Sequence, residues 1–155
     1  MDEYLLEDIQ SHNAIQMEST DYAINREGVS AAFVQAEREK STLILEAQLL
    51  RAQGQHQTAA SRFAAAAQIE ERLSDMLRGP ALQRKYFIHR FSALSCWAQA
   101  GNVYQAITMG EELLAAPDLP EALRQQVQAY VQRVRTYLER WTMQFVPELS
   151  VAVPA

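Results

Sequence analysis

The side chains best suited to chemistry in this chain are three histidines and a single cysteine, and their spacing builds no complete site. His12, His56 and His89 are too far apart in the sequence to form a local metal site. His89 and Cys96 share one helix face but supply only two ligands, too few for zinc. The sequence contains no glycine-rich phosphate loop and no serine or cysteine nucleophile motif. We therefore expect no metal, no cofactor and no catalysis.

One pair of residues supports an enzymatic alternative. Arg84 and His89 are separated by four residues in the segment RKYFIH. This spacing resembles the motif of HEPN ribonucleases, small all-helical proteins whose dimers bring two such pairs together to cleave RNA. The resemblance implies catalytic roles for Arg84 and His89. The net charge of −5 disfavours an RNA substrate, so ribonuclease activity stays the alternative to the main hypothesis.

Length and composition predict one all-α domain. The 155 residues are enough to bury a single core, and the commonest residue types are good helix formers. The chain has no run of 18 apolar residues, which predicts no membrane span. An acidic start that does not suit a signal peptide and a single cysteine predict a cytoplasmic protein.

The negative charge is concentrated at the N-terminus. Residues 1–28 hold seven acidic residues and one arginine, a net charge of −6, whereas the remainder of the chain carries +1, which together give −5. Such a segment is either a solvated helix face or a docking segment for a basic partner. The chain has no basic stripe, so we expect no nucleic-acid partner.

Breaks in the pattern of apolar residues divide the chain into about six helices. Gly54 and Gly101 each end an apolar run, and Gly79-Pro80 and residues 116–120 mark further breaks. We expect a single domain over 1–147, followed by a loose tail at 148–155. Its parts are an acidic N-terminal helix (1–28), a first hairpin (30–78), a second hairpin (81–116) and a capping helix (120–146).

Within the first hairpin the pattern predicts an inward stripe on the first helix and a cap for the second. The stripe comprises Ala32, Ala36, Leu43, Ala47 and Leu50, and the charged residues 37–40 are expected to face water. Thr58 is expected to cap the second helix through its hydroxyl.

The two hairpins resemble tetratricopeptide repeats, which combine small and large residues around a turn glycine. The first hairpin matches at Leu43, Ala47, Leu50, Gly54, Ala59, Phe63 and Ala66, and the second at Ala93, Trp97, Gly101, Ala106 and Pro117. Gly110 departs from the family pattern, which places an aromatic residue there. The resemblance implies a concave groove for a partner, lined by Ile44, Gln48, Arg51, Ile88, Phe91, Ser95 and Gln99. The other interpretation is that the apolar members of this set pack against the terminal helices.

The main hypothesis is therefore a protein-interaction module, an adaptor or assembly subunit that binds another protein or a peptide. The last helix carries more aromatic residues than a cap needs, so Trp141 and Phe145 are expected to lie in a partner or homo-oligomer interface. A further alternative is a helical bundle that binds a small molecule in an apolar pocket near Trp97 and Trp141.

Overall fold

The computed structural model describes residues 30–77 and 79–145, and all regular structure within them is helical. The α-helices are α2 (Ala31–Ala52), α3 (His56–Met76), α4 (Gln83–Gln99), α5 (Val103–Ala115) and α6 (Glu121–Phe145), and a 3-10 turn spans Pro80–Leu82. The prediction of an all-α fold is confirmed. The predicted acidic helix (1–28) and loose tail (148–155) lie outside the described residues.

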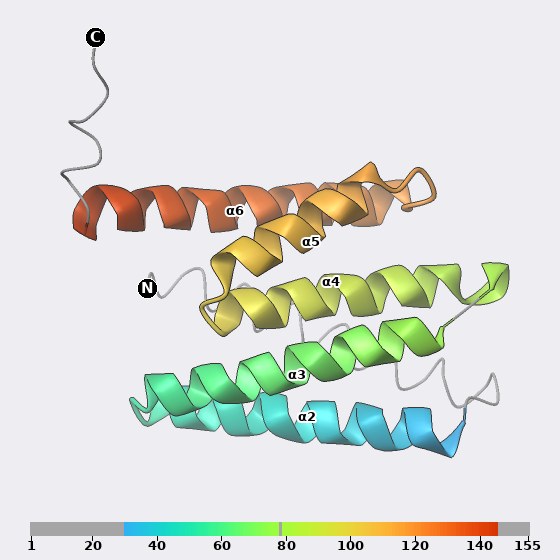
Figure 1. Ribbon diagram of the computed structural model, residues 1–155, viewed down its shortest axis with the longest axis horizontal. Helices are drawn as coiled ribbons and strands as arrows, with labels where there is room; N and C mark the ends of the chain where they lie inside the picture. The colour runs from blue at the N-terminus through green and yellow to red at the C-terminus, as the bar shows by residue number, and fades with distance from the viewer. Residues whose placement is uncertain (1–29, 78, 146–155) are drawn as a thin grey trace, which may run out of the picture.

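The helices pack in chain order, each against the next. Successive helices run in opposite directions (Figure 1), so α2 and α3 form one antiparallel hairpin and α4 and α5 form another. Helix α6 lies against α5 as the flanking C-terminal helix. This is the predicted stack of hairpins.

The two glycine turns have the same hydrogen bonds. Gly54 and Gly101 adopt positive φ angles of 78° and 85°. In the first turn the N–H of Gln55 donates to the carbonyl of Leu50 at 2.8 Å, and in the second Asn102 donates to Trp97 at 2.9 Å. Each glycine N–H also donates to the carbonyl three residues earlier, at 3.0 Å in both turns. Both helices therefore end in a Schellman motif, which needs a left-handed residue at the glycine position.

Helix α2 buries a different stripe from the predicted one. Ser30 caps the helix, since its side chain accepts from the N–H of Phe33 at 3.3 Å. The buried positions of α2 are Phe33, Glu37, Lys40, Ile44 and Ala47. The stripe prediction was wrong for Ala32, which is exposed, because the larger Phe33 beside it buries more apolar surface. The charged segment was also assigned wrongly, because Glu37 and Lys40 face the interior.

Helix α3 starts three residues earlier than a cap at Thr58 would place it. It begins at His56 with Gln55 at the N-cap, and no side chain caps it. Thr58 lies inside the first turn, so its predicted role as the cap was wrong. The inward face is rich in small residues, with Ala59, Ala66 and Ala67 almost completely buried. Such residues allow close approach of the neighbouring helices.

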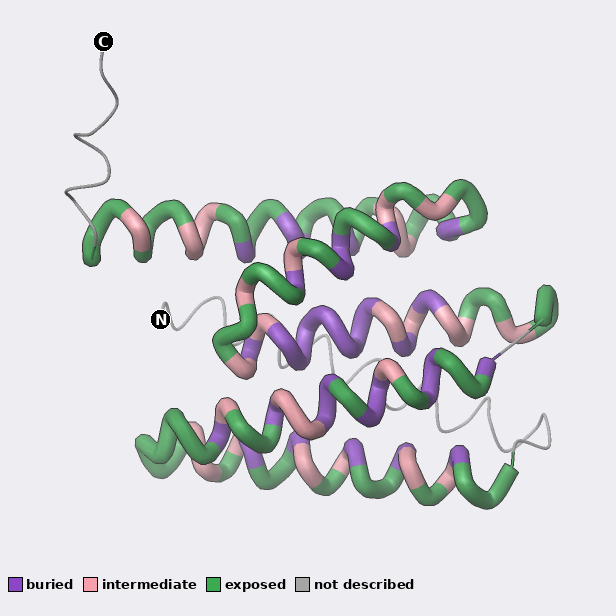
Figure 2. The backbone as a smooth tube through the Cα atoms, viewed as in Figure 1, coloured by how far each residue is buried: buried purple, intermediate pink, exposed green. Residues whose placement is uncertain are grey.

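Buried residues form two apolar clusters. The larger joins both hairpins to α6, and the smaller comprises Phe33, Ile69, Leu73 and Leu77. Figure 2 shows that α4, in the middle of the stack, is the most extensively buried helix, with every residue of 91–97 buried. Helix α4 therefore lies at the centre of the stack, between α3 and α5.

Helices α5 and α6 approach closely at Gly110. A Cβ atom at this position would lie 2.3 Å from Cγ2 of Val131, a buried residue of α6. The guanidinium of Arg124 completes the end of α5 by donating to the carbonyls of Leu114 and Ala116 at 2.6 and 2.8 Å. An aromatic residue at position 110 would separate these helices, which explains its absence here.

We expect Gly54→Val and Gly101→Val each to lower the free energy of unfolding by about 1–3 kcal/mol, as a non-glycine residue at positive φ is strained. The space around both positions is open, so crowding contributes nothing. Urea unfolding measures the loss, and Gly54→Asn should lose less because asparagine tolerates positive φ. Unchanged midpoints for both valine variants would contradict the assigned turns.

Gly110→Val should destabilise the protein by about 1–3 kcal/mol through overpacking against Val131. The matched control is Thr108→Val, an exposed position on the same helix, which should stay within about 0.5 kcal/mol of wild type. Equal stability of the two variants would show that α5 and α6 do not meet at Gly110.

Candidate functional site

Helix α6 carries an apolar stripe that continues past the hairpins. In its first half, Val127, Tyr130 and Val134 are buried against the core. The Tyr130 hydroxyl donates to the carbonyl of Ser95 at 3.4 Å, and its ring contacts Phe91 edge-on at 5.7 Å. This half of the helix is thereby fixed to α4 as well as to α5.

The same stripe reaches Trp141 and Phe145, which are 46% and 61% exposed. Their rings lie against each other with centroids 5.5 Å apart. The C-terminal part of α6 runs beyond the α4–α5 turn (Figure 1), and this explains why these two residues are exposed. We call Trp141 and Phe145 the α6 end surface; both residues were predicted to lie in an interface, and this stays a prediction.

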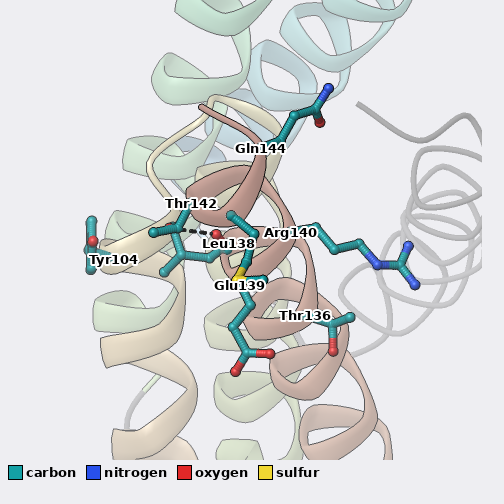
Figure 3. A pocket seen from close by; sticks show the side chains of 8 residues that line it. Tyr104, Thr136, Leu138, Glu139, Arg140, Thr142 and Gln144 are labelled. Atoms are coloured by element: carbon teal, nitrogen blue, oxygen red, sulfur yellow. Dashed lines mark hydrogen bonds between the residues drawn. The ribbon is translucent and has the colours of Figure 1, made fainter. Parts of the chain in front are cut away.

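A shallow depression of about 870 Å³ lies beside this surface. Its described lining is Tyr104, Thr136, Leu138, Glu139, Arg140, Thr142, Met143 and Gln144. Figure 3 shows Tyr104 on one side of α6 and Arg140 pointing away on the other. Because these described side chains do not converge on a shared point, they do not supply the few directed polar groups that are typical of a small-molecule site.

Neither Trp97 nor Trp141 is among the described residues that line this depression, so the depression is not the pocket predicted near them. Trp97 is 9% exposed, and its indole N–H donates to Oε2 of Glu71 at 3.3 Å. This tryptophan therefore works as a core residue that is anchored to α3.

The predicted groove is mostly inside the fold. Ile44, Phe91, Ser95 and Gln99 are at most 4% exposed. Gln48, Arg51 and Ile88 are half-buried. A partner could reach only this second group, so the groove prediction depends on these three positions.

Arg51 joins two of the predicted groove helices. Its guanidinium lies over the Phe63 ring at 4.5 Å, and its Nη1 donates to Oε1 of Gln99 at 3.4 Å. Burial lowers the pKa of this guanidinium from its ordinary value. The contact bridges α2 and α4, which makes Arg51 a structural link between the two hairpins.

The two residues of the predicted ribonuclease pair lie in different environments. Arg84 is exposed at the start of α4, whereas His89 is 1% exposed in the core. Both ring nitrogens of His89 face carboxylates of other helices. In this arrangement the imidazole has no access to a phosphate group of RNA.

His89 belongs to a layer of four ionisable side chains between α2, α3 and α4. We call Glu37, Lys40, Glu70 and His89 the buried charge layer, and each is at most 4% exposed. The Lys40 Nζ lies 3.2 Å from Oε1 of both Glu37 and Glu70. His89 Nδ1 lies 2.5 Å from Oε2 of Glu70, and its Nε2 lies 3.5 Å from Oε1 of Glu37.

Neighbouring groups stabilise the charged forms of Lys40 and Glu70 within the layer. Burial lowers the pKa of the Lys40 ammonium, but Glu70 and Glu37 outweigh this effect and raise that pKa above its ordinary value. Burial raises the pKa of the Glu70 carboxyl, but Lys40 and His89 outweigh it and lower that pKa. The stabilisation that the ionised Glu70 carboxylate contributes is therefore lost as the pH falls below the ordinary pKa of a glutamate, about 4.3.

The neighbouring Cys96 is chemically inert. Burial raises the pKa of its thiol well above the ordinary range, so no reactive thiolate forms at neutral pH. In the described part of the chain, no group of three or more histidine, cysteine or acidic side chains could hold a metal ion. No helix over the same residues is long and apolar enough to cross a membrane.

The buried charge layer was not predicted, although the sequence contains one indication of it. Glu37 and Lys40 continue the spacing of four and three residues that links Phe33, Ile44 and Ala47. Charged residues within an otherwise apolar stripe indicate buried pairing, provided that partners exist elsewhere in the chain.

Comparisons with known proteins return no relationship: no family model, no curated protein and no solved structure matches this chain. Its function is therefore inferred from its own surfaces and contacts.

Lys40→Met should cost about 3–5 kcal/mol of stability, because it leaves two buried carboxylates without their ammonium. Arg62→Met is the matched control, since the Arg62–Glu46 pair is about half exposed and should contribute at most about 1 kcal/mol. Denaturant unfolding compares the two variants. A Lys40→Met variant as stable as Arg62→Met would mean that the layer is hydrated rather than buried.

Proposed function

We propose that this chain is a protein-interaction module without catalytic activity, and that its partner contributes an apolar helix that docks on the α6 end surface. The observation that carries the proposal is the exposure of Trp141 and Phe145 on the stripe whose earlier residues are buried. Large aromatic residues are typical anchors of protein interfaces.

The architecture favours a helix as the docked element. Each of the helices α2 to α5 is covered by the next helix along the chain, and a further helix would cover the end of α6 in the same way. We also infer that the hairpins are tetratricopeptide-like, a class that mostly binds other proteins, from the small and large residues around the turn glycines 54 and 101.

A photocrosslinker in place of Trp141 tests this function in the native cell. We expect it to capture a distinct protein, and we expect Phe145→Glu in the same chain to abolish the capture. The matched control carries the crosslinker in place of Leu49, an exposed residue of α2 whose exposed fraction is 63%. Phe145→Glu should leave thermal stability nearly unchanged because the side chain is exposed.

The identity of the crosslinked peptide decides the result. A peptide from another protein, captured at 141 but not at 49, supports the proposal. Capture of a second copy of this chain, or of its own residues 1–28, would replace the proposed partner with that occupant. Equal capture from both positions would overturn the proposal, because the contact would then be nonspecific.

A further inference from the structure

One face of helix α4 points away from both of its neighbours in the stack. Its residues recur at intervals of four and three and so share one side of the helix, and we call them the inner face of α4: Ile88, Ser92, Ser95 and Gln99. Arg90 reaches Glu71 of α3 and Glu112 of α5, at 3.7 and 3.5 Å. Position 90 lies opposite the inner face in a helix of 3.6 residues per turn. Helices α3 and α5 therefore cover the other side of α4.

The inner face is nevertheless buried. Ser92, Ser95 and Gln99 are 6%, 0% and 4% exposed. Helices α2 and α6 contact this face through single side chains, since Arg51 donates to Gln99 and the Tyr130 hydroxyl donates to the carbonyl of Ser95. Serine and glutamine are mostly exposed in folded proteins. Their burial here indicates that a further segment covers the inner face.

The contact between Arg51 and Gln99 leaves hydrogen-bond donors without acceptors. Nη1 of Arg51 donates to Oε1 of Gln99 at 3.4 Å, which directs the amide Nε2 of Gln99 elsewhere. This Nε2 is buried and has no hydrogen-bond partner in the described part of the chain. A guanidinium has five N–H donors, and among the described residues no carboxylate pairs with that of Arg51.

These donors define the chemistry of the missing group. A buried donor without an acceptor is costly, and a guanidinium forms its strongest hydrogen bonds with carboxylates. A carboxylate accepts several hydrogen bonds and also balances the positive charge of Arg51. The site at Arg51 and Gln99 therefore fits a carboxylate.

The chain itself contains a segment rich in carboxylates. Residues 1–28 hold seven acidic residues and one arginine, a net charge of −6. Arg51 lies 20 residues after the start of α2 at Ala31, which is about 30 Å along the helix. A segment of 28 residues spans about 42 Å even in helical form. It is therefore long enough to return along α2 to Arg51.

We propose that residues 1–28 of the same chain occupy the inner face of α4, and that a carboxylate of this segment binds the Arg51 guanidinium and the Gln99 amide. The face between α2 and α6 is then closed to a partner until the segment leaves it, and an acidic peptide would compete with the segment for Arg51 and Gln99. The α6 end surface lies beyond the α4–α5 turn, so a partner can bind there with the segment in place.

A photocrosslinker in place of Gln48 in the purified full-length protein tests where the segment lies. Gln48 is half-buried on α2, one turn before Arg51. We expect crosslinks to residues 1–28 within a single chain, at the mass of the monomer. The control carries the crosslinker at the next position, Leu49, which is 63% exposed. A crosslinked dimer, equal crosslinking from both positions, or no peptide from residues 1–28 would overturn the proposal.

Neutralising the segment tests the carboxylate itself. In this variant the seven acidic residues of 1–28 are replaced by the corresponding amides. Arg51→Met should lower the Tm of the wild type by about 2–4 °C more than that of the neutralised chain, because only the wild type retains the carboxylate. Arg62→Met is the control, since its partner Glu46 lies outside the segment and the loss should be the same in both chains. If Arg51→Met also costs the same in both chains, no carboxylate of the segment binds Arg51.

Discussion

Taking four ionisable side chains out of water between α2, α3 and α4 is the constraint on which the rest of this structure depends. Such a layer is favourable only when each charge meets its partner, so it tolerates very few alternative packings. Moving α2 along α3 by one helical turn, about 5.4 Å, would leave Lys40 without Glu70. The layer therefore sets the register of the first hairpin and its placement on α4. It also separates the smaller apolar cluster from the main core along the hairpin.

The first hairpin is held to α4 by the larger apolar cluster, by the buried charge layer and by the contact between Arg51 and Gln99. The second hairpin and α6 depend on close apolar packing at Gly110, and on the Arg124 guanidinium at the end of α5. The last turns of α6 run past the α4–α5 turn, and the α6 end surface is exposed there.

The sequence predicted those features that depend on local backbone chemistry. Turn glycines at 54 and 101 place the hairpins, since only a left-handed residue completes the Schellman motif. Predictions from the sequence were wrong where contacts between residues far apart in the chain decide which side chains are buried. Glu37 and Lys40 look like surface residues because their partners Glu70 and His89 lie on other helices, and these two are themselves 19 residues apart. The burial of Phe91 and Ser95 likewise depends on which helices cover α4, and a local pattern does not contain that information. Trp141 and Phe145 are exposed on the apolar stripe of α6, and their role in an interface stays a prediction.

Hydrogen exchange, measured peptide by peptide, tests most directly whether the buried charge layer holds the first hairpin in place. In the wild type, residues 31–52 of α2 should exchange as slowly as the central helix α4, because the layer couples them. In Lys40→Met, exchange should accelerate across α2 and the facing part of α3, while α5 and the first half of α6 keep their protection. Unchanged protection of α2 in Lys40→Met would contradict the account, since α2 would then be held by apolar packing alone.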